Sequence, residues 1–174
     1  IAVALMLISP ELVLIFGSPK YREAVYVIPP VAASVFFIFI YNILSMPQFY
    51  YEKTQFLMAA SMAAAGANVV LNFIFIRLFG YIAAGYTTLA CYMLYSVGHY
   101  IVSKRILVNE GIQENLMSPG FLVACSVFLI GASIICNLIF PYRILRYAIL
   151  LASAGLVFWK KELLLKTMAD IRKK

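Results

Sequence analysis

Charged residues are scarce in this chain. They make up 12 % of its 174 residues, whereas a soluble domain carries about a quarter. Acidic side chains are fewest, with seven Asp and Glu in total, and the sequence holds one His and three Cys. Hydrophobic residues, by contrast, account for 64 % of the chain. This composition excludes an ordinary soluble globular domain.

The sequence also lacks the patterns that carry covalent chemistry. It contains no phosphate-binding glycine loop, no metal-ligand spacing and no nucleophile with a plausible base. The three cysteines lie inside apolar runs without regular spacing, which favours small apolar fillers over a metal site or disulfides. The acidic residues lie at the ends of these runs, in loops or in the tail, with Glu11 nearest to an exception. We therefore expect no enzyme, no cofactor and no metal.

Long uncharged runs are abundant, and they indicate a membrane protein. A helix needs around 20 apolar residues to cross the hydrocarbon layer. Runs of nearly this length or more occupy residues 24–47, 54–76, 82–103 and 119–140, a shorter one occupies 144–159, and the chain opens inside another at 1–16. The opening run has no basic leader and no cleavage site, so it does not match a signal peptide. These runs predict an all-α fold, a polytopic transmembrane helix bundle of about five complete spans plus one partial, at the rear of a longer protein.

The net charge of +7 is explained better by membrane topology than by nucleic acid, because the basic residues lie at span ends and in the tail. If successive spans alternate direction, one side holds Lys53, Lys104, Arg105, Lys160, Lys161, Lys166, Arg172, Lys173 and Lys174, and the other holds Lys20, Arg22, Arg77, Arg143 and Arg146. The richer side is expected to be cytoplasmic, which places the C-terminus inside. Residues 106–118 and 161–174 mix apolar and polar residues, which favours segments at the membrane surface. For the tail, a solvated topology anchor is at least as strong an interpretation as a regulatory helix.

Polar residues recur at helical spacing inside three consecutive spans. They are Ser34, Tyr41, Ser45 and Gln48 in the first, Ser61, Ala65, Asn68 and Asn72 in the second, and Thr88, Tyr92, Tyr95, His99 and Ser103 in the third. Polar groups facing hydrocarbon are costly, so they turn towards protein or water. The three stripes predict either a shared wet cavity or hydrogen bonds between helices.

Both interpretations, a wet cavity and interhelical hydrogen bonds, apply to the individual polar residues. Asn68 and Asn72 follow a surface of small residues that lets helices approach closely, which favours an interhelical contact over a ligand site. For His99, a structural hydrogen bond competes with a titrating role. Tyr92 and Tyr95 suit helix packing and contact with sugar rings equally well.

Arg77 differs from these because it is a charge at the end of an otherwise uncharged span. Its side chain can extend to the membrane surface. The alternative is a phosphate site, since a guanidinium matches phosphate oxygens with two parallel hydrogen bonds.

The segment NVVLNFIFIRLFGYIAAGYTT resembles a pattern of bacterial polysaccharide flippases, the O-antigen and capsule exporters related to multidrug and toxin extrusion transporters. The matching positions are Asn68, Leu71, Asn72, Ile76, Gly80, Ala84 and Thr88. The stretch ISPELVLIFGSPKYREA at residues 8–24 and the Lys53-Thr54 pair are also similar to that family. The departures are Arg77 in place of a proline, Ala83 in place of a glycine and Gly85 in place of an alanine. The resemblance extends to about residue 105.

The resemblance implies the C-terminal part of a two-lobed transporter of about fourteen spans. Residues 1–105 would form the last spans of one lobe, 106–118 an interfacial cytoplasmic loop, 119–160 a terminal two-span appendage and 161–174 a basic cytoplasmic tail. The implied function is translocation of an undecaprenyl-pyrophosphate-linked oligosaccharide across the bacterial inner membrane for surface polysaccharide assembly. Its partners would be that lipid-linked oligosaccharide, membrane lipids and polysaccharide polymerase machinery, with no nucleic acid.

The candidate substrate-binding residues are Gln48, Asn68, Asn72, Arg77, Tyr92, Tyr95 and His99. A multidrug or cation antiporter of the related family is the alternative, and it predicts a buried carboxylate elsewhere in the protein. A membrane scaffold without transport predicts that the three stripes are dry and packed.

Overall fold

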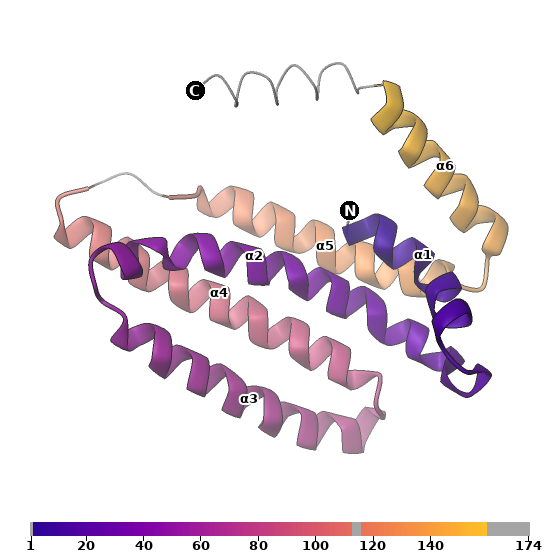
Figure 1. The fold of residues 1–174 in the computed structure, drawn as a ribbon, viewed down its shortest axis with the longest axis horizontal. Helices are drawn as coiled ribbons and strands as arrows, with labels where there is room; N and C mark the ends of the chain where they lie inside the picture. Colours follow the sequence, from indigo (N-terminus) through magenta and orange to yellow (C-terminus); the bar gives the residue numbers. More distant parts are fainter. Residues whose placement is uncertain (1, 113–115, 160–174) are drawn as a thin grey trace. The chain divides into compact units, whose positions relative to one another are not determined.

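The computed structural model describes residues 2–112 and 116–159, and its regular elements are helices (Figure 1). In chain order they are α1 (Ala2–Phe16), the 3₁₀ helix η1 (Pro19–Val27), α2 (Ile28–Tyr50), α3 (Gln55–Phe79), α4 (Ala83–Asn109), α5 (Pro119–Ile139) and α6 (Arg143–Trp159). The all-α prediction is confirmed for the described residues.

Local sequence signals set the helix ends. Pro29 and Pro30 lie in the first turn of α2, where a missing backbone N–H costs nothing. After α2 the chain reverses through Glu52, which has a left-handed φ of 56°. Gly80 ends α3 with φ 77°, and its N–H donates to the Ile76 carbonyl at 2.9 Å. Glycine adopts this backbone region without a Cβ clash, so the chain turns directly into α4.

Helix α4 lies between α2 and α3 and packs against both (Figure 1). Its buried residues Ser96, His99 and Ser103 contact α2. The buried residues of α2 include Phe37, Ile40 and Leu44. Helix α3 has no buried residue and contacts the bundle along one side only. Within the first unit of the chain, α4 is therefore the central helix that positions groups from both neighbours.

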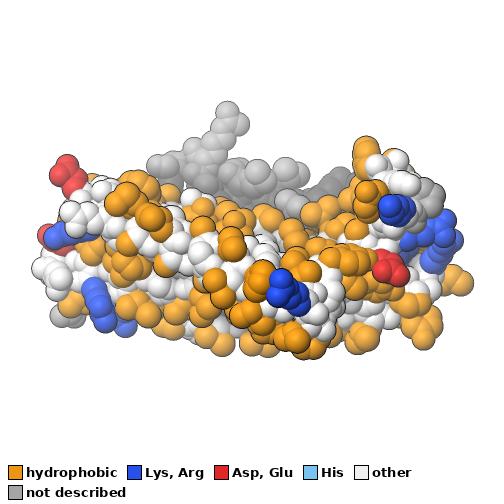
Figure 2. Space-filling view, turned by 90° about the horizontal axis from the view of Figure 1, so that it is seen from below, with side chains coloured by type: hydrophobic (Ala, Val, Ile, Leu, Met, Phe, Trp, Pro, Cys, Tyr) orange, Lys and Arg blue, Asp and Glu red, His pale blue; other side chains and the backbone are white. Residues whose placement is uncertain are grey.

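Large apolar side chains remain exposed, and Figure 2 shows hydrophobic side chains over much of one face of the molecule. On α3 they are Met58, Met62, Val69, Val70, Phe73, Ile74, Phe75, Ile76, Leu78 and Phe79. In water a patch of this extent marks an interaction surface or an aggregation hazard. In a bilayer it is the ordinary surface of a spanning helix.

Three helical segments in the described residues are long and apolar enough to cross a membrane, namely Lys20–Tyr50, Gln55–Phe79 and Pro119–Ile139. Helix α1 is apolar but shorter. Helix α4 has 27 residues, which corresponds to about 40 Å. It is therefore long enough to cross a membrane, but it contains more polar residues than the three apolar segments. The count of five complete spans plus one partial stays a prediction.

The chain separates into two compact units, residues 1–137 and 138–174. Most of α5 belongs to the first unit, and α6 belongs to the second. Helix α4 continues to Asn109, so the beginning of the expected interfacial loop at 106–118 is helical. The predicted tail at 161–174 lies outside the described residues.

Candidate functional site

A groove of about 470 Å³ lies between α3 and α4, with one tyrosine of α2 at its side. We call it the polar groove. It is lined by Tyr41, Ser61, Ala64, Ala65, Asn68, Val69, Thr88, Cys91, Tyr92 and Tyr95. All three polar stripes of the sequence contribute to this lining, and their convergence on one space is the central observation about the site.

The α3 wall of the groove combines small side chains with an amide. Ala64 and Ala65 leave the volume open, because only a methyl group projects from each. The Asn68 amide donates to Thr88 Oγ1 across the helix interface at a long 3.5 Å. Ser61 Oγ lies 2.8 Å from the Tyr95 hydroxyl. Polar contacts thus join α3 to α4 at both ends of the groove.

Asn72 lies one helical turn beyond the groove, and its amide is used between helices. Its Nδ2 donates to Asn68 Oδ1 at 2.9 Å. Its Oδ1 accepts a hydrogen bond from the Thr87 hydroxyl of α4. This bonding matches the interhelical reading of Asn72, while Asn68 both joins the helices and lines the groove.

Three tyrosines from two helices form the opposite side of the groove. Tyr41 of α2 stacks with Tyr92 of α4 at 6.4 Å between ring centroids and an interplanar angle of 7°. Tyr41 also contacts Tyr95 at 4.7 Å with a tilt of 59°. Such rings offer apolar faces together with hydroxyl groups, so the lining can contact both the faces and the hydroxyls of a sugar.

Gln48 and His99 do not line the groove. Both are fully buried between α2 and α4, and the Gln48 Nε2 lies 2.9 Å from His99 Nδ1. The His99 ring packs edge-on against Tyr95 at 4.5 Å and lies 5.7 Å from Tyr41. This pair therefore supports two groove tyrosines from behind.

Arg77 is exposed and lies away from the groove lining. Its guanidinium carbon is 3.9 Å from the centroid of the Phe73 ring, one turn earlier on α3. This is a cation–π geometry. The predicted phosphate contact of Arg77 stays a prediction, separate from the polar groove.

Cys91 is a groove residue that the sequence analysis treated only as an apolar filler. Its position three residues after Thr88 and four before Tyr95 puts it on the same helical face, which is the signal that identifies it. Tyr41, Ser61 and Thr88 belonged to the polar stripes but not to the selected candidates. Within residues 2–112 and 116–159, no charged side chain lines the groove and no cluster of three or more potential metal ligands occurs.

The fold and the groove together define a class: a chain that is all-helical in its described residues, with long apolar helices compatible with membrane spans and a polar groove between α3 and α4. No family model, no curated protein and no solved structure matches this chain significantly.

Proposed function

We propose that this chain is the C-terminal part of a membrane flippase that translocates an undecaprenyl-pyrophosphate-linked oligosaccharide across the bacterial inner membrane. The polar groove would contact the sugars, and the lipid tail would remain in the bilayer. The resemblance of residues 68–88 to polysaccharide flippases supplies the substrate class. The convergence of three polar stripes on one groove is the observation that carries the proposal.

The chemistry of the lining suits a neutral, hydroxyl-rich ligand. Asn68 and Thr88 offer amide and hydroxyl groups, and the tyrosines offer ring faces, whereas the Ser61 hydroxyl donates to the Leu57 carbonyl of its own helix at 2.8 Å. A volume of about 470 Å³ falls within the roughly 300–1,000 Å³ of small-ligand sites. The uncharged side chains among the described lining residues favour a sugar over a cation in this part of the site.

In this proposal α4 crosses the membrane with α2, α3 and α5. Its lower hydropathy follows from its place in the bundle, because its polar residues face α2, α3 and the groove. Transport would proceed by rocking of two lobes around a central site, the arrangement common to secondary transporters. No covalent step is required.

The test uses the full-length protein in proteoliposomes that contain a lipid-linked oligosaccharide. The appearance of the sugar in the opposite leaflet is measured with a membrane-impermeant glycosidase. Asn68→Leu should lower the translocation rate by about tenfold or more, the scale of one unpaired polar contact. Asn42→Leu is the matched control, because Asn42 is exposed and its amide donates to Ile38 O of its own helix at 2.7 Å.

Equal rates for the Asn68 and Asn42 variants at equal protein levels would contradict the site assignment. The antiporter alternative would be favoured by two results together. The unmodified protein and its variants would all fail to translocate the oligosaccharide, and the unmodified protein would export a cationic dye when driven by a proton or sodium gradient.

A further inference from the structure

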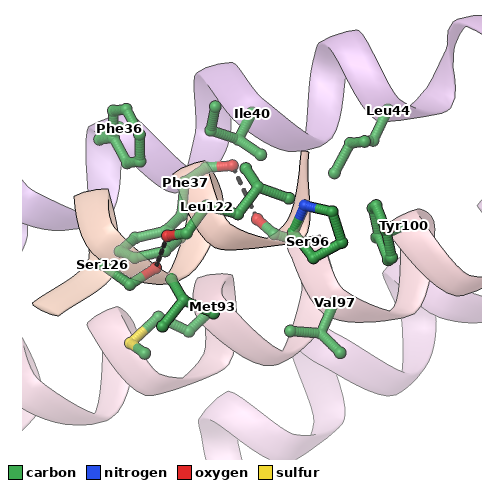
Figure 3. A pocket seen from close by; sticks show the side chains of 12 residues that line it. Phe36, Phe37, Ile40, Leu44, Met93, Ser96, Val97, Tyr100, Leu122 and Ser126 are labelled. Atoms are coloured by element: carbon green, nitrogen blue, oxygen red, sulfur yellow. Dashed lines mark hydrogen bonds between the residues drawn. The ribbon is translucent and has the colours of Figure 1, made fainter. Parts of the chain in front are cut away.

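A second hollow opens on another face of α4, between α2, α4 and α5 (Figure 3). We call this space of about 170 Å³ the apolar pocket. It is lined by Phe36, Phe37, Ile40, Leu44, Met93, Ser96, Val97, Tyr100, Pro119, Leu122, Val123 and Ser126. It shares no lining residue with the polar groove.

The two serines of the apolar pocket offer no free donor to a ligand. Ser96 Oγ lies 2.9 Å from both the Phe37 and the Tyr92 carbonyl oxygens, to which its single hydroxyl hydrogen can donate. Ser126 Oγ donates to the Leu122 carbonyl at 2.7 Å, and Figure 3 shows both serines bonded in this way. The pocket wall is therefore hydrocarbon in character along most of its length.

Tyr100 is the exception, and it marks one end of the pocket. Its hydroxyl oxygen is buried and has no hydrogen-bond partner among the described residues. An unpaired buried hydroxyl costs free energy, so this atom is suited to a polar group of a bound molecule.

Tyr100 also lines a second space of about 500 Å³, which we call the basic cleft. Its lining comprises Tyr100, Ile101, Lys104, Arg105, Val108 and Asn109. Neither Lys104 nor Arg105 forms an ion pair with a carboxylate in the described part of the chain. The apolar pocket and the basic cleft thus share Tyr100 as a lining residue, and the cleft carries two cations, Lys104 and Arg105.

The dimensions match one leaflet of a bilayer. From Phe36 to Leu44 the pocket follows nine residues of α2, which span about 12 Å at the helical rise. Half of the hydrocarbon core measures roughly 15 Å. The basic cleft lies towards the C-terminal end of α4, and Pro119 at the beginning of α5 lines the apolar pocket together with Tyr100. If α4 and α5 span a bilayer, these helix ends would lie at its surface.

We propose that the apolar pocket and the basic cleft together bind one anionic phospholipid of the bilayer. The phosphate lies at Lys104 and Arg105, one acyl chain fills the apolar pocket, and the Tyr100 hydroxyl donates to an ester or phosphate oxygen between them. Basic pockets between spanning helices are suited to anionic head groups. The bound chain joins α5 to α2 and α4, so the lipid is a structural ligand, separate from the transported substrate.

The experiment measures lipid binding by native mass spectrometry on the full-length, delipidated protein with added phosphatidylglycerol. Lys104→Gln and Arg105→Gln should each weaken apparent binding by about fivefold, which corresponds to the contribution of one cation near an anionic membrane surface. Lys53→Gln is the matched control, because Lys53 is an exposed cation outside the cleft. Val97→Phe, which fills the apolar pocket without changing charge, should weaken binding as well.

Competing ligands identify the source of the phosphate. Phosphatidylcholine has the same tails without net charge, and inorganic phosphate has no tail, so neither should displace phosphatidylglycerol. Displacement by inorganic phosphate, or equal binding to the Lys104, Arg105 and Lys53 variants, would overturn the proposal. Stronger binding of undecaprenyl phosphate than of phosphatidylglycerol would overturn it too, because the site would then serve the substrate.

This binding experiment is independent of the translocation assay. A protein that binds phosphatidylglycerol as described but moves no oligosaccharide would contradict the proposed function alone. A protein that translocates the oligosaccharide but shows no charge-dependent lipid binding would contradict the phospholipid site alone.

Discussion

Gln48 forms the most deeply buried polar contact between α2 and α4, and its replacement by leucine tests how that contact stabilises the bundle. Gln48, His99 and Ser103 are all fully buried. The Gln48 Nε2 lies 2.9 Å from His99 Nδ1 and donates to Ser103 Oγ at 2.9 Å. The Ser103 hydroxyl donates to the Leu44 carbonyl. His99 Nδ1 also lies 3.2 Å from Gln48 Oε1, so the Gln48 amide can pair with a neutral His99 ring as donor or as acceptor.

The expected cost follows from what each partner loses. In Gln48→Leu, Ser103 keeps its hydrogen bond to Leu44, but His99 Nδ1 loses its hydrogen-bond partner in a buried position. A buried group in this state costs about 1–3 kcal/mol. We therefore expect Gln48→Leu to lower the free energy of unfolding by about 1–3 kcal/mol.

A double-mutant cycle separates the contact from the rest of the change. Removing His99 as well, in Gln48→Leu/His99→Phe, should cost less than the sum of the two single changes. The difference should be about 0.6–1.7 kcal/mol, the range found for hydrogen bonds between membrane helices. The measurement is reversible unfolding of the full-length protein in mixed micelles.

Asn42→Leu is again the control, because Asn42 bonds only within its own helix and is exposed. Its change in unfolding free energy should stay within about 0.5 kcal/mol. The reasoning would be refuted if Gln48→Leu were equally harmless, or if the two single changes added to within about 0.5 kcal/mol.

Two further predictions concern the ends of the helices near Gly80. A Cβ added at Gly85 would lie 2.8 Å from Pro30 Cγ, so Gly85→Ala should destabilise the fold by about 1–3 kcal/mol. Gly66→Ala is the control, because a Cβ at Gly66 meets open space and should not destabilise the fold. Thermal unfolding of both variants checks this prediction. Partial desolvation raises the pKa of Tyr81, and so does Glu23, whose carboxylate accepts the Tyr81 hydrogen bond at 3.0 Å. Because the folded pKa is raised, the contribution of Tyr81 to stability is present below pH 10 and is lost at higher pH as the phenol ionises. Glu23→Gln should lower the Tyr81 pKa. The Tyr81 titration is isolated by subtracting the tyrosinate absorbance of a Tyr81→Phe variant from that of the protein with Tyr81, once with Glu23 and once with Glu23→Gln. An unchanged Tyr81 pKa would contradict the contact.

The helices themselves could be predicted from the sequence because apolar runs of this length leave few other structures in a bilayer. The polar faces could be predicted as well, since residues three or four apart share one side of a helix. Asn68, Tyr92 and Tyr95 lie in the polar groove for this reason. The helical period, however, gives only the direction of a residue around its own helix axis, and not its position relative to a neighbouring helix.

Other candidates depended on how far neighbouring helices extend past one another. Gln48 and His99 share the stripes of Tyr41 and Tyr95, yet they lie beyond the groove, where α2 and α4 approach too closely to leave a space. Arg77 belongs to the same helix as Asn68 but contacts Phe73 on the exposed side. Helical spacing gives an angle around the axis and not the distance to the next helix.

The sequence by itself determined that this protein is built of apolar helices, and on which face of each helix the polar groups lie. Both properties follow from local composition and from the fixed period of the helix. Only the tertiary structure decided that three such faces meet at one groove, and that Tyr100 lines both a separate apolar pocket and a basic cleft. Those arrangements depend on the packing distances between helices, which are set by side chains far apart in the chain.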